Sequence, residues 1–392
     1  MFTLSRRTAQ SEHAVPGARR GFAMFLAIGA LVIVGVLVAG SSFVTLQEQR
    51  LGQNSIVQAK AFSAAEYGLN KIQADWDKTP TLQMTNGAKF DTTYQVAGQG
   101  EARVRYVRLN NETFWIVSEG RATAGNSANA SRVSVKRVGA VLRLRIPTIR
   151  ANGAITTAGN ISVKGSGEVL GNNYLPSGWT NCDATKPGKA GIVATPTATV
   201  DIQKASAVTG SPQVSRDPLA ADSNTYVRYG DETWQALVAM ANITLTNGSG
   251  PDAAPVAVNG SCDKTLQSNW GEPHRGAGTV AECYNYFPII YSTTSLHVNN
   301  GRGQGILLVD GDIRMNGNFQ WYGLIIARDD IIKGNGTANI HGAVMARNAN
   351  IADPSEVLGN ITFQYSECSI EHAMRGSAQV VQAKERAWTE LY

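Results

Sequence analysis

Charged residues are scarce in this chain, and no familiar catalytic motif is present. Asp, Glu, Lys and Arg make up 17% of its 392 residues. There is no GxSxG elbow, no Walker A loop and no HExxH zinc motif, and the histidines stand at no ligand spacing. These absences argue against a serine hydrolase, a P-loop protein and a zinc protease. We therefore expect a protein that is not an enzyme and holds no metal or cofactor.

The excess of basic charge is small and lies at one end. The formal net charge is +5, and Arg6, Arg7, Arg19 and Arg20 against Glu12 supply +3 of it. The remaining +2 is spread over the rest of the chain. Nucleic-acid-binding proteins carry a concentrated basic patch, so no nucleic-acid partner is expected.

Proline is absent between Pro16 and Pro80, and charge is absent from Gly21 to Gln47. The uncharged run exceeds the roughly 7 to 15 residues of a secretory h-region and meets the roughly 20 that a spanning helix needs. We expect a retained membrane span with residues 1–20 as a basic leader in the cytoplasm, because the arginines precede the run. Val38–Gly40 also fits a small-residue cleavage site, so a removed signal is the alternative.

A helical seam follows the apolar run. Apolar residues recur at spacings of 3, 4, 3 and 4, at Phe62, Ala65, Leu69, Ile72 and Trp76. One helix over 21–76 would be about 80 Å long, against roughly 30 Å of membrane hydrocarbon. Its outer half must therefore pack on something.

Glycine is abundant beyond this helix, with 40 residues in the chain, and the texture changes to β. Two β-rich runs flank Asn110-Asn111, a pair that tolerates a hairpin turn. Leu142 and Leu144 alternate with Arg143, as in a half-exposed strand. We predict a small antiparallel sheet over 77–148 that covers the helical seam.

Residues 149–369 contain an internal repeat. Similar segments begin at Gly305, Gly323 and Gly342, at spacings of 18 and 19 residues. Each has a glycine, four small or apolar residues, a polar turn and an aliphatic residue. Short strands repeating at this interval bury their apolar faces by stacking about 4.8 Å apart, which predicts a parallel β-helix. An antiparallel meander is the alternative.

The same register recurs outside these copies. Ile161 corresponds to Ile313, and Leu296 fits the same position. Stacked copies would make Asp310 and Arg328 charge partners in the turns. A long insertion, about 171–286, separates the first coil from the rest and contains one expected helix that begins near Asp231.

The end of the chain, over 370–392, is predicted to be a helix that caps the end of the β-helix. The fold class is therefore α+β and mainly β: a long N-terminal transmembrane helix, a small antiparallel sheet, a parallel β-helix and a C-terminal helix.

Aspartates cluster in the turns of the repeat, where Asp is favoured for bonding the backbone. Parallel β-helices often cleave acidic polysaccharides with clustered aspartates, so a catalytic or calcium-binding role is the alternative. The residues concerned are Asp310, Asp312, Asp329 and Asp330.

The chain has four cysteines, Cys182, Cys262, Cys283 and Cys368, all beyond the span. Because the cytoplasmic leader places everything after Ser41 outside, these cysteines are expected in an oxidising compartment, where an even count predicts two disulfides. Three pairings can be drawn. Cys262 with Cys283 is the local choice, which leaves Cys182 with Cys368. A zinc site of all four cysteines is the alternative, although no CxxC spacing is present.

The stretch "TLQEQRLGQNSIVQAKAFSAAEYGL", Thr45 to Leu69, resembles the N-terminal domain of PilX-type minor pilins of the bacterial type IV pilus. The segments "NYFPIIY", "GQGILLVDGD" and "ERAWTELY" are similar to the large C-terminal region of a PilX-like subgroup. The matching positions of the first stretch are Thr45, Leu46, Glu48, Gly52, Asn54, Ala61, Phe62, Ala64, Ala65, Glu66, Gly68 and Leu69.

The resemblance implies a minor pilin of the bacterial inner membrane that contributes to type IV pilus assembly, with surface adhesion as a further role. Its partners would be the membrane, other pilin subunits and the assembly machinery. Prepilin cleavage would follow Gly21 and leave Phe22 as the first residue; Leu26 then stands fifth, where ordinary pilins have glutamate. The assembly motif of the helix would comprise Glu48, Asn54, Phe62, Glu66 and Leu69.

Two other functions are compatible with the sequence. One is a membrane-anchored β-helix protein that binds or cleaves carbohydrate. The other is a structural envelope protein with no pilus partner.

Overall fold

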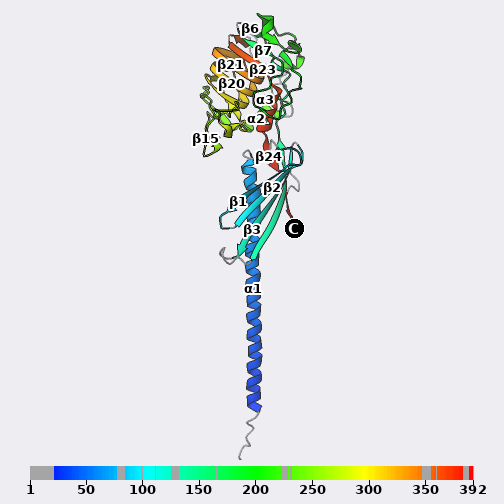
Figure 1. Ribbon diagram of the computed structural model, residues 1–392, viewed down its shortest axis with the longest axis vertical. Helices are drawn as coiled ribbons and strands as arrows, with labels where there is room; N and C mark the ends of the chain where they lie inside the picture. The colour runs from blue at the N-terminus through cyan, green and yellow to red at the C-terminus, as the bar shows by residue number, and fades with distance from the viewer. Residues whose placement is uncertain are drawn as a thin grey trace, which may run out of the picture.

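The computed structural model is mainly β and begins with one long apolar helix (Figure 1). The antiparallel sheet lies beside the second half of this helix, and a larger β region lies beyond its end (Figure 1). The structure describes residues 22–76, 84–98, 100–110, 112–124, 132–164, 166–221, 228–229, 232–346, 355–358, 360–382 and 388–391.

Helix α1 spans Phe22–Ala74 and is 53 residues long, as the absence of proline predicts. Every side chain from Ala23 to Ile56 is exposed. Burial begins at Val57, where the antiparallel sheet first covers the helix. The predicted division of the helix into a free half and a packed half is therefore confirmed.

The antiparallel sheet has six strands in the order β1-β2-β3-β4-β24, with β25 also paired to β4. Asn110 Oδ1 accepts hydrogen bonds from the backbone N–H of Glu112 and of Thr113, which closes the predicted hairpin between β2 and β3. Leu142 and Leu144 are buried. The strands are β1 Lys89–Val96, β2 Gly100–Arg108, β3 Thr113–Ala124, β4 Arg132–Arg145, β24 Gln379–Gln382 and β25 Trp388–Leu391.

The helix predicted over 370–392 is wrong beyond Gly376. Helix α3 spans Glu367–Gly376, and the chain then supplies β24 and β25 to the antiparallel sheet. Gly376 lies against the ring of Phe287, at a distance where a β-carbon would approach the ring to 2.4 Å. The segment "QVVQ" that follows contains β-branched residues that suit a strand. Helix α3 packs along β19, β20 and β21 rather than over the end of the stack.

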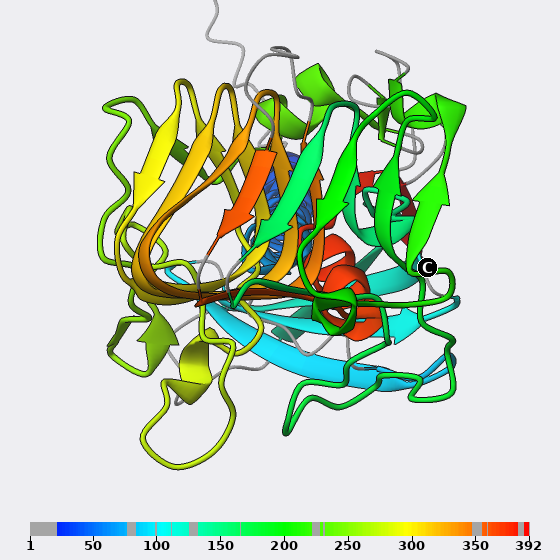
Figure 2. The same ribbon diagram turned by 90° about the horizontal axis from the view of Figure 1, so that it is seen from above.

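A second sheet contains fifteen strands, and its pairs are parallel. Figure 2 shows many of its strands side by side, with α3 in red close to them. The strands are β5 Gly153–Thr157, β6 Ile161–Lys164, β7 Glu168–Leu170, β8 Ala190–Ala194, β9 Val200–Ile202, β10 Val208–Thr209, β11 Val214–Arg216, β14 Ile243–Leu245, β17 Ile289–Ser292, β18 Leu296–Val298, β19 Gly301–Val309, β20 Ile313–Ala327, β21 Ile331–Ala346, β22 Ser355–Leu358 and β23 Asn360–Tyr365.

The repeat found in the sequence sets the register of this sheet. Gly305 pairs with Gly323, and Gly323 with Gly342. All three glycines have positive φ, between 119° and 152°, a backbone conformation that side chains rarely adopt. Leu296, Ile313 and Ile331 form a second column of paired positions.

The order of the strands differs from their order along the chain. Strand β5 pairs with the end of β21, and β6 pairs with β22, so the first strands stack on the last ones. The segment predicted as an insertion, 171–286, is not one excursion. Its strands β8 and β9 extend the stack beyond β5 and β6, and its strand β14 pairs with β17 at the other end.

Short elements complete the fold. Helix α2 spans Trp234–Ala239, and Thr233 caps it by accepting a hydrogen bond from Ala236 N–H. The predicted cap Asp231 lies outside the described residues. Two small hairpins pair β12 Arg228–Tyr229 with β13 Glu232–Thr233 and β15 Ala257–Val258 with β16 Ser261–Cys262.

Candidate functional site

Among the described residues, the first half of α1 is the longest continuous exposed apolar surface. Its most apolar 18-residue window has a mean hydropathy of 2.7, and no part of that window is buried. By length and composition this helix can cross a membrane. The uncharged stretch from Phe22 to Gln47 is about 39 Å long, which exceeds roughly 30 Å of hydrocarbon. Residues 48–56, some polar and some apolar, then separate this stretch from Val57.

The positions predicted as an assembly motif fall into two groups. Glu48 and Asn54 are exposed on the free half of α1. Phe62 and Glu66 are half-buried, and Leu69 is buried against the antiparallel sheet. Gly21 lies outside the described residues, and Phe22 begins α1. The structure thus divides the motif between the free half of the helix and the half that holds the chain's own sheet.

Small residues of the stretch from Thr45 to Leu69 let α1 approach the sheet closely. Ala61, Ala65 and Gly68 are buried on β2 and β3. A β-carbon on Gly68 would lie 2.7 Å from the β-carbon of Ala102, and one on Gly120 would lie 1.9 Å from the carbonyl oxygen of Ala61. Contacts this short leave no room for a methyl group. We conclude that these small residues serve the close packing of the second half of α1 on the antiparallel sheet, which we call the clasp.

Aromatic rings pack together at the C-terminal end of the clasp. Trp76 packs edge-on against Phe114 with 4.9 Å between ring centroids, and it also lies 5.9 Å from Tyr106. Such aromatic pairs stabilise the packing by more than the burial of their apolar area alone. The start and the end of the packed half of α1 are therefore both tied to the sheet.

Trp388 is a residue of this region that sequence reasoning missed, because it lay within the predicted C-terminal helix. It stands on β25, 44% exposed, and packs edge-on against Phe62 at 6.1 Å. Trp388, Leu69, Asn70 and Glu66 line an open depression of about 320 Å³ beside α1. Strand β25 thus places Trp388 beside α1, close to the point where the packed half of the helix begins.

The outer face of the antiparallel sheet carries ion pairs across its strands. Arg105 Nε lies 2.7 Å from Asp91 Oδ1, and Arg137 Nη2 lies 2.7 Å from Glu119 Oε2. The hydrogen bond from Arg105 lowers the pKa of the Asp91 carboxyl below its usual value. Opposite charges facing each other across strands stabilise the pairing modestly. This face is a network of paired charges and not a basic patch.

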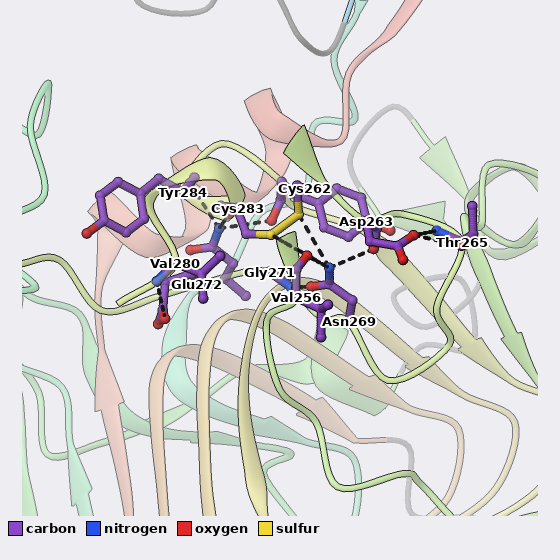
Figure 3. Close-up of a disulfide and its surroundings, with 12 residues drawn as sticks. Val256, Cys262, Asp263, Thr265, Asn269, Gly271, Glu272, Val280, Cys283 and Tyr284 are labelled. Carbon is purple, nitrogen blue, oxygen red and sulfur yellow. Dashed lines mark hydrogen bonds between the residues drawn. A yellow bond between two sulfur atoms is a disulfide. The ribbon is translucent and has the colours of Figure 1, made fainter. Parts of the chain in front are cut away.

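The four cysteines form two disulfides with the pairing favoured by the sequence. Cys262 bonds Cys283, and Cys182 bonds Cys368. Figure 3 shows the first of these beside Asn269, whose Nδ2 donates to the carbonyl oxygens of Val256 at 2.9 Å and Asp263 at 2.6 Å. This disulfide and the Asn269 hydrogen bonds cross-link the long loop before β17, residues 246–288, which includes β15 and β16.

The turn aspartates make the bonds that a structural role requires. Arg328 Nη1 lies 3.0 Å from Asp310 Oδ1, so the predicted charge pair is present. Asp312 Oδ1 accepts a hydrogen bond from the backbone N–H of Asp330 at 2.9 Å. Asp329 donates its own N–H to the carbonyl of Gly311. These bonds link neighbouring turns of the stack.

No family model matches the chain, and no curated protein is similar to it. A solved structure with a detectable likeness is the "Crystal structure of competence-associated pilin ComZ from Thermus thermophilus". It is 14% identical, covers 86% of this chain and 97% of that chain, and superposes with a TM-score of 0.21. A likeness at this TM-score decides neither fold nor function. The resemblance to PilX-type minor pilins therefore stays a prediction.

Proposed function

We propose that this chain is a non-enzymatic, PilX-like minor pilin of the bacterial inner membrane that assembles with other subunits of a type IV pilus. One observation carries the proposal: a single helix offers a fully exposed apolar half, while its other half is clasped by a sheet. The free half from Phe22 to Ile56 is about 50 Å long. Outside a bilayer, such a surface needs other helices to cover it.

The resemblance over Thr45 to Leu69 supports the same function. The clasp explains why small residues stand at Ala61, Ala65 and Gly68, whereas Glu48 and Asn54 are exposed on the half of α1 that the sheet does not cover. Four arginines before the span support a cytoplasmic N-terminus, and two disulfides support an outer location for the β domains.

We interpret the parallel sheet as a β-helix whose successive coils are the repeat units. The columns of paired glycines and aliphatic residues, set 18 and 19 residues apart, support this interpretation. On this reading α1 and its sheet form a stalk, and the β-helix is the part presented to the surroundings.

The outer face of the β-helix supports a second function, adhesion through neutral carbohydrate. Gln320, Asn339 and Thr362 occupy paired positions on β20, β21 and β23, and all three are half-buried. Asn318 and Thr337 form the neighbouring column. Amide and hydroxyl groups at about 4.8 Å intervals can bond successive hydroxyls of an extended glycan. At its two ends the column continues with Arg302 and Glu168, so it is uncharged at its three central positions.

The first residue of the mature protein tests the assembly proposal. Mass analysis of the chain recovered from membranes should give Phe22 with a methylated amine. A chain that begins at Met1 would be a retained anchor, and one that begins near Ser41 would overturn assembly through α1.

A photo-crosslinking residue at Leu31, which is 71% exposed, should join the chain to other pilin subunits. The same residue at Leu175, 44% exposed on the β-helix domain, is the matched control and should not form that product. An anchor without pilus partners gives no crosslinked subunit from either position.

A further inference from the structure

The disulfide between Cys182 and Cys368 has a third soft ligand beside it. His372 follows Cys368 by one turn of α3, and its Nε2 lies 3.7 Å from Cys182 Sγ. The two sulfurs and the ring nitrogen all lie within 4.8 Å of one another. Among the described residues, no third ligand of the His, Asp, Glu or Cys type completes such a group at Cys262 and Cys283. The two disulfides of this chain are therefore chemically different.

His372 lies among aromatic rings beside the two sulfurs. Its ring packs 5.0 Å from Trp179 and 5.9 Å from Phe287, and burial lowers its pKa below the usual value. Its Nε2 lies 3.0 Å from the carbonyl oxygen of Thr180 and donates the ring proton to it, so Nε2 becomes a ligand only when that proton moves to Nδ1.

The spacing of the ligand atoms fits a tetrahedral site. With Zn–S of about 2.3 Å and Zn–N of about 2.1 Å, sulfur and nitrogen ligands lie about 3.6 Å apart and two sulfurs about 3.8 Å apart. The observed distance from sulfur to nitrogen is 3.7 Å. The cysteine Cα atoms are 5.2 Å apart, so rotation of the two side chains can separate the sulfurs. The S–S bond must be reduced, and the ring proton on Nε2 must move, before a metal ion can bind.

The loop that carries Cys182 is held to α3 by other bonds as well. Asn173 Oδ1 accepts a hydrogen bond from the N–H of Glu367 at 3.0 Å. Lys186 pairs with Glu371 on α3. On the other side of the loop, Trp179 Nε1 donates to the carbonyl of Pro273 at 2.7 Å. Because these contacts do not involve sulfur, we expect the three ligands to stay together when the disulfide is reduced.

We propose that Cys182, Cys368 and His372 form a binding site for a thiophilic divalent cation, such as Zn²⁺, when their disulfide is reduced. A dithiol supplies the two electrons and two protons that convert the S–S bond to two thiols, and becomes a disulfide itself. The Nε2 proton of His372 moves to Nδ1, and Zn²⁺ then displaces both thiol protons and binds two thiolates and the imidazole Nε2, with water as fourth ligand. The site carries no net charge, which suits its apolar neighbours Trp179, Phe287 and Tyr322.

The cross-link between this loop and α3 would therefore have two forms. In the oxidised form a disulfide joins the loop to α3, and in the reduced form a metal ion joins the same residues. The β domain is then cross-linked at this point under both oxidising and reducing conditions, provided that the cation is present.

Cobalt binding tests the proposal on the full chain in detergent. After reduction with a dithiol and removal of the reductant without air, Co²⁺ should bind with one equivalent per chain and show cobalt–thiolate charge-transfer absorption. Zn²⁺ should displace it, and the oxidised chain should bind none. The variant Cys262→Ser/Cys283→Ser is the matched control and should still bind one equivalent.

The variant His372→Ala should weaken cobalt binding at least about 100-fold, more than is typical for loss of an outer-shell partner. Circular dichroism of each variant shows whether it is folded. No thiolate absorption in the reduced chain overturns the proposal. So does absorption that survives His372→Ala unchanged or disappears in Cys262→Ser/Cys283→Ser.

Discussion

Gly120 on β3 lies directly against the backbone of Ala61 on α1, so closely that a β-carbon there would be 1.9 Å from the Ala61 carbonyl oxygen. This contact couples the helix that we place in the membrane to the sheet outside it. The same close approach explains why Ala61 and Gly120, which are far apart in the sequence, are both small.

We predict that Gly120→Ala loosens the clasp by about 2–3 kcal/mol, because a methyl group overpacks a contact that involves backbone atoms. Hydrogen exchange should become faster in β3 and in the packed half of α1. Gly52→Ala is the matched control, since Gly52 has open space around its α-carbon and the change should cost nothing. Equal exchange in Gly120→Ala and the wild type would show that the helix and sheet do not approach as described.

A buried ion pair determines the acid sensitivity of the long loop before β17. The Glu272 side chain is 0% exposed and bonds Arg302 at 2.8 Å. Burial alone would raise the pKa of Glu272. Hydrogen bonds from Arg302 and from the N–H groups of Val280 and His274 outweigh burial and lower it.

Because the folded pKa is lowered, this carboxylate stabilises the fold above the unfolded pKa of about 4.3, and that stability is lost as the pH falls through the folded value. Arg302→Met should cost about 3–5 kcal/mol at pH 7, since it leaves a buried charge unpaired. The double variant Glu272→Gln/Arg302→Met should recover much of the loss in urea unfolding. A single variant as stable as the wild type contradicts the pairing.

His341 adds a second pH dependence at milder acidity. Its ring lies between Tyr174, at 4.7 Å, and Tyr322, at 4.6 Å, with His274 near by. Burial, with a smaller effect of His274, lowers the pKa of His341 to about 4. The neutral ring is therefore the form that the folded chain prefers.

The lowered pKa implies full stability above the unfolded pKa of about 6.5 and a loss that grows as the pH falls from there to about 4. The loss should reach at most about 3 kcal/mol. His341→Phe keeps an aromatic ring in the stack and should flatten the unfolding free energy across this pH window. A slope that is the same in both proteins would assign the dependence to other groups.

The polar strip on β20, β21 and β23 gives a binding prediction. On an array of neutral oligosaccharides, the wild type should bind at least one glycan, and Asn339→Ala should weaken that binding by about tenfold for a lost pair of hydrogen bonds. Arg105→Ala, on the antiparallel sheet, is the control and should bind normally. If no neutral glycan binds, or if Arg105→Ala has the same effect, the adhesion proposal is wrong.

Several features follow from the sequence alone because their causes are local. The absence of proline and charge determines an uninterrupted helix, and apolar residues at spacings of 3 and 4 mark its packed half. The glycines at 305, 323 and 342 determine the register of the parallel strands, because only glycine suits the positive φ at each position. The nearness of Cys262 and Cys283 in the chain favours their pairing.

Other features depend on contacts between distant segments. Every strand of the repeat has the same register, so pairing alone does not specify which neighbour β5 takes, and only the folded chain places it on β21. Trp388 lies within the stretch predicted as a helix, yet in the structure it belongs to β25 and pairs with the edge of β4. His372 belongs to no motif, and only the packing of α3 on a distant loop brings it to Cys182. The sequence determined the elements and their spacing, whereas burial and the pairing of open edges decided their neighbours.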